Sequence, residues 1–135
     1  MKQFFILFYI VCATPFMIHG QTGMDLKITD VIIKPANPSV GDALVISYKV
    51  VNAGNLIIPG GTYSASLTIN KEIVSFDDDT ETLTIGQSAI YSKVEGTYHK
   101  LIDKKGAYHW EIKVKTKFKD VTPENNTQKG TILVQ

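Results

Sequence analysis

The chain contains no arginine and a single cysteine, Cys12, which lies in the apolar segment at the N-terminus. Arginine is the side chain best suited to bidentate contact with phosphate groups, so its absence argues against nucleic-acid binding. The 14 lysines are nearly balanced by 13 acidic residues, and no strong field draws the chain to nucleic acid or to anionic membranes. Helical periodicity is also scarce after residue 24, which argues against a helical domain.

The N-terminal segment has the features of a secretory signal peptide. Lys2 precedes a short apolar run, Phe4–Val11, and small residues lie near an expected cleavage point at Gly20–Gln21. The run is too short to span a bilayer, which takes roughly 20 residues. We therefore expect a leader at 1–20 that is removed on export. The mature domain, 21–135, is expected in the periplasm or outside the cell, with no transmembrane segment.

The position of Cys12 affects two further predictions, namely lipid attachment and disulfide formation. A leader cut just before it would give a lipoprotein, but Val11 stands where lipoprotein signals carry a small residue. Cleavage near Gly20 instead leaves a domain without cysteine and therefore without disulfides. A domain of about 115 residues buries roughly two-thirds of its unfolded surface, so a single apolar core must hold it together.

Apolar and polar residues alternate along three segments, 43–51, 62–70 and 107–119. The third segment is the longest. One of its faces carries Tyr108, Trp110, Ile112, Val114 and Phe118, and the other carries His109, Glu111, Lys113, Lys115, Lys117 and Lys119. Such alternation predicts strands with one buried side and one solvated side.

Shorter strand-like runs separated by turn-forming residues complete the pattern. They are 26–33, 72–76, 82–85, 89–98 and 131–134. About seven or eight short strands without intervening helices predict a single all-β domain. The expected architecture is an antiparallel immunoglobulin-like (fibronectin-type) β-sandwich.

Four residues are expected to be structural. In immunoglobulin-like sandwiches a tyrosine near the start of a late strand hydrogen-bonds to backbone just upstream, and Tyr108 fits that position. Trp110, two residues on, is expected to fill the space between the sheets. Asn125 and Asn126, in "PENN", predict a corner before the last strand, because asparagine tolerates left-handed backbone conformations.

Several motifs together resemble the bacterial CARDB family (cell-adhesion-related domains). The matching elements are Asp25-Leu26, the turn Asn37–Asp42, Asn52-Ala53-Gly54, Gly86, Gly106-Ala107-Tyr108 and Glu124-Asn125-Asn126. They cover nearly all of the mature chain in the family's order. The resemblance implies an immunoglobulin-like sandwich from a secreted or surface protein, with an interaction or spacer role.

No nucleophile elbow, phosphate loop or metal-binding helix is present, so we expect no enzyme activity. The leading hypothesis is an exported module that contacts a protein or a cell surface. One alternative is a carbohydrate-binding module, for which Tyr91, Tyr98 and His99 are the available platform residues. Another is a small envelope protein that escorts or inhibits a partner enzyme.

Two sets of residues are candidates for partner binding. Leu56, Ile57 and Ile58 are consecutive apolar residues in an expected loop, and they either pack on the core or form a contact patch. The lysine row consists of Lys113, Lys115, Lys117 and Lys119. It would bind an acidic glycan or an acidic protein surface, or it simply protects a solvated face from edge aggregation.

We predict no cofactor and no firm metal site. The acidic run Asp77, Asp78, Asp79 and Glu81 offers calcium ligands but lacks the spacing of a calcium loop, so a solvated hairpin tip is the preferred interpretation. His99 and His109 have no third ligand nearby in the sequence, which argues against zinc.

Overall fold

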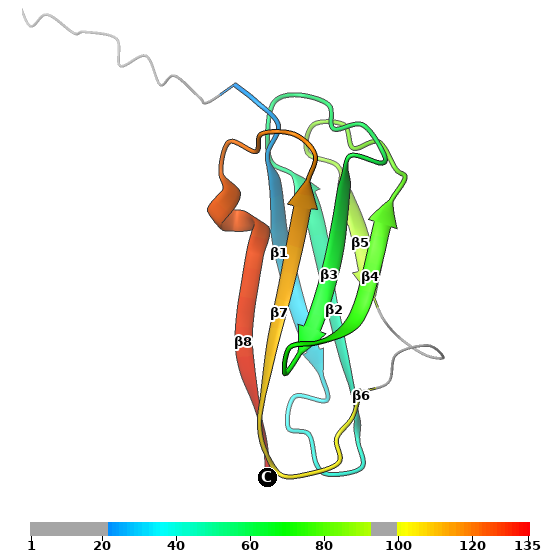
Figure 1. The fold of residues 1–135 in the computed structure, drawn as a ribbon, viewed down its shortest axis with the longest axis vertical. Coiled ribbons are helices and arrows are strands. Elements are labelled where there is room, and N and C mark those ends of the chain that lie inside the picture. The colour runs from blue at the N-terminus through cyan, green and yellow to red at the C-terminus, as the bar shows by residue number, and fades with distance from the viewer. Residues whose placement is uncertain (1–21, 93–99) are drawn as a thin grey trace, which may run out of the picture.

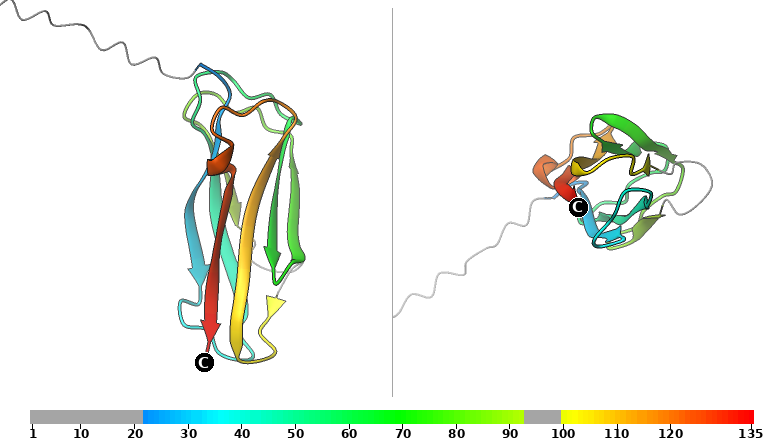
Figure 2. Two further views of the ribbon diagram at one scale, coloured as in Figure 1. Left: turned by 60° about the vertical axis from the view of Figure 1, so that its left-hand side comes forward. Right: turned by 90° about the horizontal axis from the view of Figure 1, so that it is seen from below.

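The computed structural model describes residues 22–92 and 100–135, and side chains in 22–89 and 101–135. Two antiparallel four-stranded sheets face each other (Figures 1 and 2). The first sheet contains β1 (Leu26–Lys34), β2 (Ala43–Asn52), β5 (Ser88–Ser92) and β6 (Lys100–Leu101). The second contains, in spatial order, β4 (Glu72–Asp79), β3 (Tyr63–Ile69), β7 (Gly106–Thr116) and β8 (Thr127–Val134). The predicted all-β antiparallel sandwich is confirmed.

The leader at 1–20, with Cys12, lies outside the described residues. The same holds for Tyr98 and His99, and for the side chain of Tyr91. The signal peptide and the aromatic platform therefore stay predictions.

Alternation of burial follows the sequence pattern closely in the central strands. Every second residue of β2 and of β3 is buried. The inward-facing side chains are Leu44, Ile46, Tyr48 and Val50 from β2, and Tyr63, Ala65, Leu67 and Ile69 from β3. The two sheets thus meet through one apolar layer, in which each strand contributes every second side chain.

Two tyrosines from opposite sheets are the largest fully buried side chains of this layer. The hydroxyl of Tyr108 lies 3.1 Å from the carbonyl oxygen of Lys104 and 2.9 Å from Oδ1 of Asp103, both just upstream on the connection into β7. Burial, and secondarily the nearby carboxylate of Asp77, raise the pKa of Tyr48 above its usual range. The Tyr48 ring therefore stays neutral at physiological pH, as its place in the buried core requires.

The position of Trp110 differs from the one expected, which was the centre of the space between the sheets. It pairs with Gly130 on β8, an edge strand, and is only half-buried while packing against the core. A Cβ at Gly130 would lie 2.7 Å from Cζ2 of the indole, so the ring lies directly across this glycine. The indole covers the edge of the core, and the two buried tyrosines fill its centre.

Two expected local structures are wrong. Residues Asp77–Asp79 continue β4 and pair with β3, so they do not form a hairpin tip. The hairpin turns earlier, at Asn70 and Lys71, which both have positive φ. The segment 82–85 is a loop with a single bridge between Leu83 and Ile58.

The C-terminal part also differs in detail. β7 ends at Thr116, so Lys117, Phe118 and Lys119 follow the strand and do not extend its face. "PENN" forms a short 3₁₀ helix, η1 (Pro123–Asn126), and neither asparagine has a positive φ. The corner is present, but it is made by a helical turn and not by left-handed asparagine.

Gly130→Ala should destabilise the domain by about 1–3 kcal/mol, because the new methyl group must displace the indole of Trp110. Urea denaturation measures the loss, and fluorescence of the single tryptophan reports the displaced ring. In a Trp110→Leu background the same substitution should cost almost nothing. An equal cost in both backgrounds would show that the indole does not lie on this glycine.

Candidate functional site

The connections between the sheets gather at one end of the sandwich. The loop 53–62 joins β2 to β3, the loop 80–87 joins β4 to β5, and the N-terminal segment 22–25 lies beside them (Figure 1). In sandwiches of this kind the end loops are free to vary while the sheets hold them in place. This end is therefore the first place to search for a binding surface.

The structure divides the apolar run Leu56–Ile58. Ile58 is fully buried and exchanges two backbone hydrogen bonds with Leu83, at 3.0 and 2.9 Å. Leu56 and Ile57 are 44% and 57% exposed. Ile58 therefore packs in the core, whereas Leu56 and Ile57 face solvent.

Asn52, at the end of β2, ties the two loops together. Its side chain is 1% exposed, and its Nδ2 donates to the carbonyl oxygens of Leu56 at 2.8 Å and of Leu83 at 3.1 Å. Its Oδ1 accepts from the N–H of Gly54 at 3.1 Å. A buried amide with these contacts fixes both loops from beneath.

The N-terminal segment holds the 53–62 loop from its other side. The N–H of Gly23 donates to Oδ1 of Asn55 at 2.8 Å, and the N–H of Asn55 donates to the carbonyl oxygen of Gly23 at 3.1 Å. A Cβ at Gly54 would collide with this same carbonyl oxygen and lie 2.7 Å from the N atom of Asp25. Only glycine allows so close an approach of two backbones.

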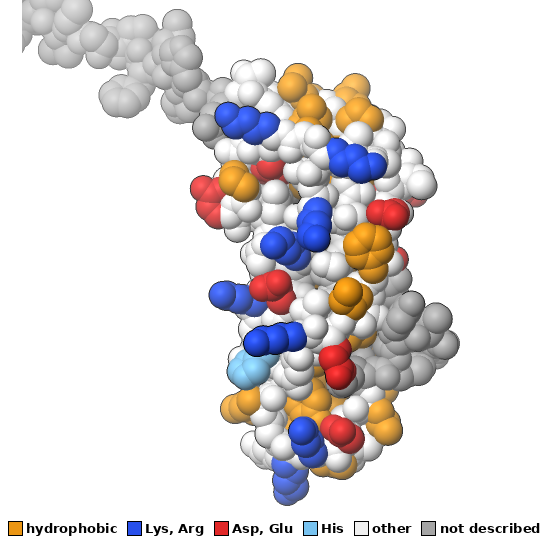
Figure 3. All heavy atoms as spheres, in the orientation of Figure 1, with side chains coloured by type: hydrophobic (Ala, Val, Ile, Leu, Met, Phe, Trp, Pro, Cys, Tyr) orange, Lys and Arg blue, Asp and Glu red, His pale blue; other side chains and the backbone are white. Residues whose placement is uncertain are grey.

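Leu56, Ile57 and Ile85 form what we call the end patch. Ile85 is 61% exposed, and the next residue, Gly86, donates its N–H to the carbonyl oxygen of Asn52. The three residues thus belong to the two loops that Asn52 joins, and Figure 3 shows hydrophobic side chains at this end. Lys117 contacts the same 53–62 loop, donating from Nζ to the carbonyl oxygen of Gly61 at 2.8 Å. The patch is apolar, exposed and set on fixed loops.

The acidic run does not converge on one point. Alternation along β4 places Asp77 and Asp79 on one face and Asp78 on the other. Asp77 accepts from Oγ of Ser75 at 2.9 Å, and Oδ1 of Asp79 accepts from the N–H of Glu81 at 2.7 Å. Within the described ranges, no group of three or more histidine, cysteine, aspartate or glutamate side chains is placed to hold a metal ion.

The four lysines of the candidate row do not form a single straight line. Lys113 and Lys115 project from the outer face of β7, whereas Lys117 and Lys119 belong to the segment that follows the strand. All four are exposed. On the same outer face, Nδ1 of His109 lies 3.0 Å from Oγ1 of Thr131, so this histidine links β7 to β8.

A polar corner near the N-terminus is not predictable from the sequence. Asp120, 9% exposed, accepts at Oδ2 from the N–H of Leu26 at 3.0 Å and at Oδ1 from the N–H of Thr122 at 2.8 Å. Nδ2 of Asn125 donates to Oδ1 of Asp25 at 2.9 Å. These contacts join residues 94 and 100 positions apart, so no local pattern could reveal them. They fasten η1 to the start of β1.

Comparison with solved structures identifies the fold. The CARDB domain of a Pyrococcus furiosus protein, solved in complex with di-metal ions, superposes with a TM-score of 0.67 over 86% of this chain and 94% of that one, at 16% identity. Its solution structure gives 0.66 over 84% and 97%, also at 16% identity. The chain has the fold of a CARDB domain. The resemblance seen in the sequence motifs is confirmed for the fold.

Two further neighbours are parts of larger proteins. A domain of a protein provisionally assigned to the cell surface in Methanosarcina acetivorans superposes with a TM-score of 0.58 at 16% identity, over 83% of this chain and 94% of the domain. A β-glucosidase from Erythrobacter marinus gives 0.52 at 18% identity, and the match covers 83% of this chain but 16% of the glucosidase. No family model and no curated protein matches the sequence. In the part of the chain that the structure describes, no helix has the length and apolar character needed to cross a bilayer.

Asn52→Ala should lower the free energy of unfolding by about 2–3 kcal/mol, since it removes three hydrogen bonds and leaves carbonyl oxygens without a donor. Asn55→Ala is the matched control, because Asn55 is exposed and its side chain accepts one bond from Gly23. The control should cost less than about 1 kcal/mol. Equal losses in urea denaturation would contradict the anchoring role of Asn52.

Proposed function

We propose that this protein is an exported, non-catalytic CARDB-like module that binds another protein through the end patch. The observation that carries the proposal is the exposure of Leu56 and Ile57 on loops whose backbone is fixed by Asn52 and by Ile58. Fixed loops lose little conformational entropy on binding, and exposed apolar side chains gain from burial. A preformed apolar patch of this kind suits a protein surface.

Export is supported by the leader expected at 1–20 and by the surface assignment of the Methanosarcina neighbour. We propose a mature domain at 21–135 in the periplasm or outside the cell. The di-metal ions of the Pyrococcus domain are a property of that protein. No metal enters the proposal, because Asp77, Asp78 and Asp79 project from both faces of their strand.

An accessory role toward an enzyme is the second candidate. The glucosidase neighbour carries a module of this fold as a small part of a catalytic chain. In this version the module described here would likewise act beside a catalytic protein. The end patch would then be the surface that meets the catalytic protein, so the same experiment tests both versions.

The test compares two purified double variants with the unaltered protein. Leu56→Ser/Ile57→Ser should reduce capture of a protein partner from the native envelope fraction by about tenfold or more, because two apolar side chains no longer become buried on binding. Its melting temperature should stay close to that of the unaltered protein, because both side chains face solvent. Quantitative mass spectrometry of the captured proteins gives the ratio.

The matched control is Ile32→Ser/Leu133→Ser, which removes two side chains that are 51% and 70% exposed on the sheets. This variant should capture the same proteins as the unaltered chain. Equal loss in both double variants would mean that general surface hydrophobicity, and not the end patch, drives capture. Undiminished capture by the patch variant would refute the proposal.

A further inference from the structure

The outer face of the β3–β7–β8 sheet carries a second surface, distinct from the end patch. Lys113 and Lys115 project from β7 about 7 Å apart, which is the distance between alternate residues of a strand. Lys129 projects from β8 on the same face, and blue side chains follow this face in Figure 3. The net charge of the chain is +1, and acidic side chains lie among the lysines on this face in Figure 3.

The lysines are surrounded by short hydroxyl side chains. Ser66 on β3 and Thr127 on β8 lie in register with Lys113, and Ser64 on β3 lies in register with Lys115. Because serine and threonine side chains are short, the lysine ammonium groups project beyond a surface of hydroxyl groups. These hydroxyl groups can form hydrogen bonds with a ligand that is itself rich in hydroxyl groups.

Lys113, Lys115 and Lys129 form no ion pair within 4.0 Å with a described carboxylate. One ion pair, between Lys49 and Asp30, lies on the other sheet. Lys129 faces Glu111 across the β7–β8 ladder without forming such a pair. These charges therefore remain available to an anionic ligand.

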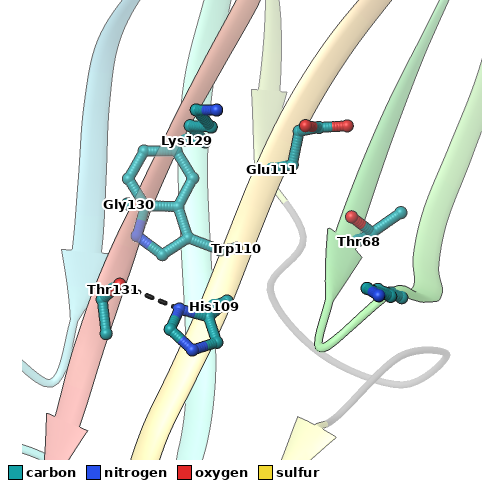
Figure 4. A pocket seen from close by; sticks show the side chains of 8 residues that line it. Thr68, His109, Trp110, Glu111, Lys129, Gly130 and Thr131 are labelled. Carbon is teal, nitrogen blue, oxygen red and sulfur yellow. Dashed lines mark hydrogen bonds between the residues drawn. The ribbon is translucent and has the colours of Figure 1, made fainter.

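A cavity of about 360 Å³ lies at the lower part of this face (Figure 4). Lys71 and Lys129 stand at its two sides, and Thr68, Glu111 and Thr131 line it between them. The two lysines supply positive charge for a carboxylate. The hydroxyls and the carboxylate of Glu111 are partners for sugar hydroxyl groups. The volume is sufficient for a single sugar ring.

The cavity is held in a fixed shape by the β3–β4 turn. Asn70 and Lys71 have φ values of 51° and 69°, which is the backbone of a two-residue type I′ hairpin turn. Oδ1 of Asn70 accepts from the N–H of His109 at 2.9 Å, and its own N–H donates to the carbonyl oxygen of His109 at 2.7 Å. His109 in turn contacts Thr131. The turn, β7 and β8 are thus joined around the cavity.

We propose that this face binds an acidic polysaccharide of the uronic-acid type, with one sugar unit in the cavity and the chain running along Lys113 and Lys115. Glu111 within the cavity disfavours a ligand whose charge is dense and uninterrupted, such as a nucleic acid. It favours one in which carboxylates alternate with hydroxyls. This surface is separate from the end patch, so the inference goes beyond the proposed function and does not depend on it.

The experiment titrates the mature protein with a defined oligogalacturonate and follows binding by calorimetry at several salt concentrations. Lys113→Gln/Lys129→Gln should weaken binding by about tenfold or more and should flatten the dependence of log K on log salt concentration, because two fewer charges are neutralised. Thr131→Val should also weaken binding without changing the salt dependence, since it removes a hydroxyl and no charge.

The matched control, Lys27→Gln/Lys34→Gln, removes two exposed lysines from β1 on the other sheet. It should bind as tightly as the unaltered protein. A neutral oligosaccharide of equal length should not bind. Three outcomes would overturn the proposal: no binding of oligogalacturonate, equal weakening by the control, or equal binding of polyglutamate, which would point to an acidic protein as the ligand.

Discussion

The fold depends on one apolar layer between two sheets, because the described domain contains no cysteine that could cross-link them. Each sheet contributes alternate side chains to this layer, and Tyr48 and Tyr108 are its largest fully buried members. Dispersion and the removal of apolar surface from water must therefore supply nearly all the inter-sheet attraction. Alternation also gives β3 and β7 a polar or charged outer face, and the lysines of β7 belong to that face.

The same layer positions the loops at the end of the sandwich. Ile58 and Leu83 belong to the core, yet they lie within the two connections that cross between the sheets. Asn52 adds a buried polar contact at the same point. A loop anchored by one core side chain and one buried amide behaves as an extension of the sheets, so the end patch is a fixed surface. This arrangement connects the stability of the domain to its proposed binding role.

Much of the architecture could be predicted from the sequence because strand alternation is local and has a period of two. The core faces of β2, β3 and β7 follow directly from it. Features that depend on distant partners could not be predicted. Asp120 looks like a turn residue until it is seen to accept from the N–H of Leu26. Trp110 is the largest residue of its strand, which predicts a central position, but Gly130 on the edge strand supplies the space that the indole needs.

Two other differences have the same origin. The acidic run resembles a turn by composition, and pairing with β3 overrides that preference. In the candidate site, the apolar run at 56–58 and the Asn52-Ala53-Gly54 motif are visible in the sequence, whereas the anchoring role of Asn52 and the exposure of Ile85 are not. Their importance comes from contacts across the loops.

The central claim is that the loops carrying the end patch are part of the rigid core, and amide hydrogen exchange measured by NMR tests it most directly. The N–H groups of Ile58 and Leu83 should exchange about as slowly as those of Ile46 and Leu67 in the central strands, because their opening requires the core itself to open. The N–H of Ile57, one residue away, should exchange rapidly. If Ile58 and Leu83 instead exchanged as fast as Ile57, the loops would open independently of the sheets, and the end patch would not be a fixed surface.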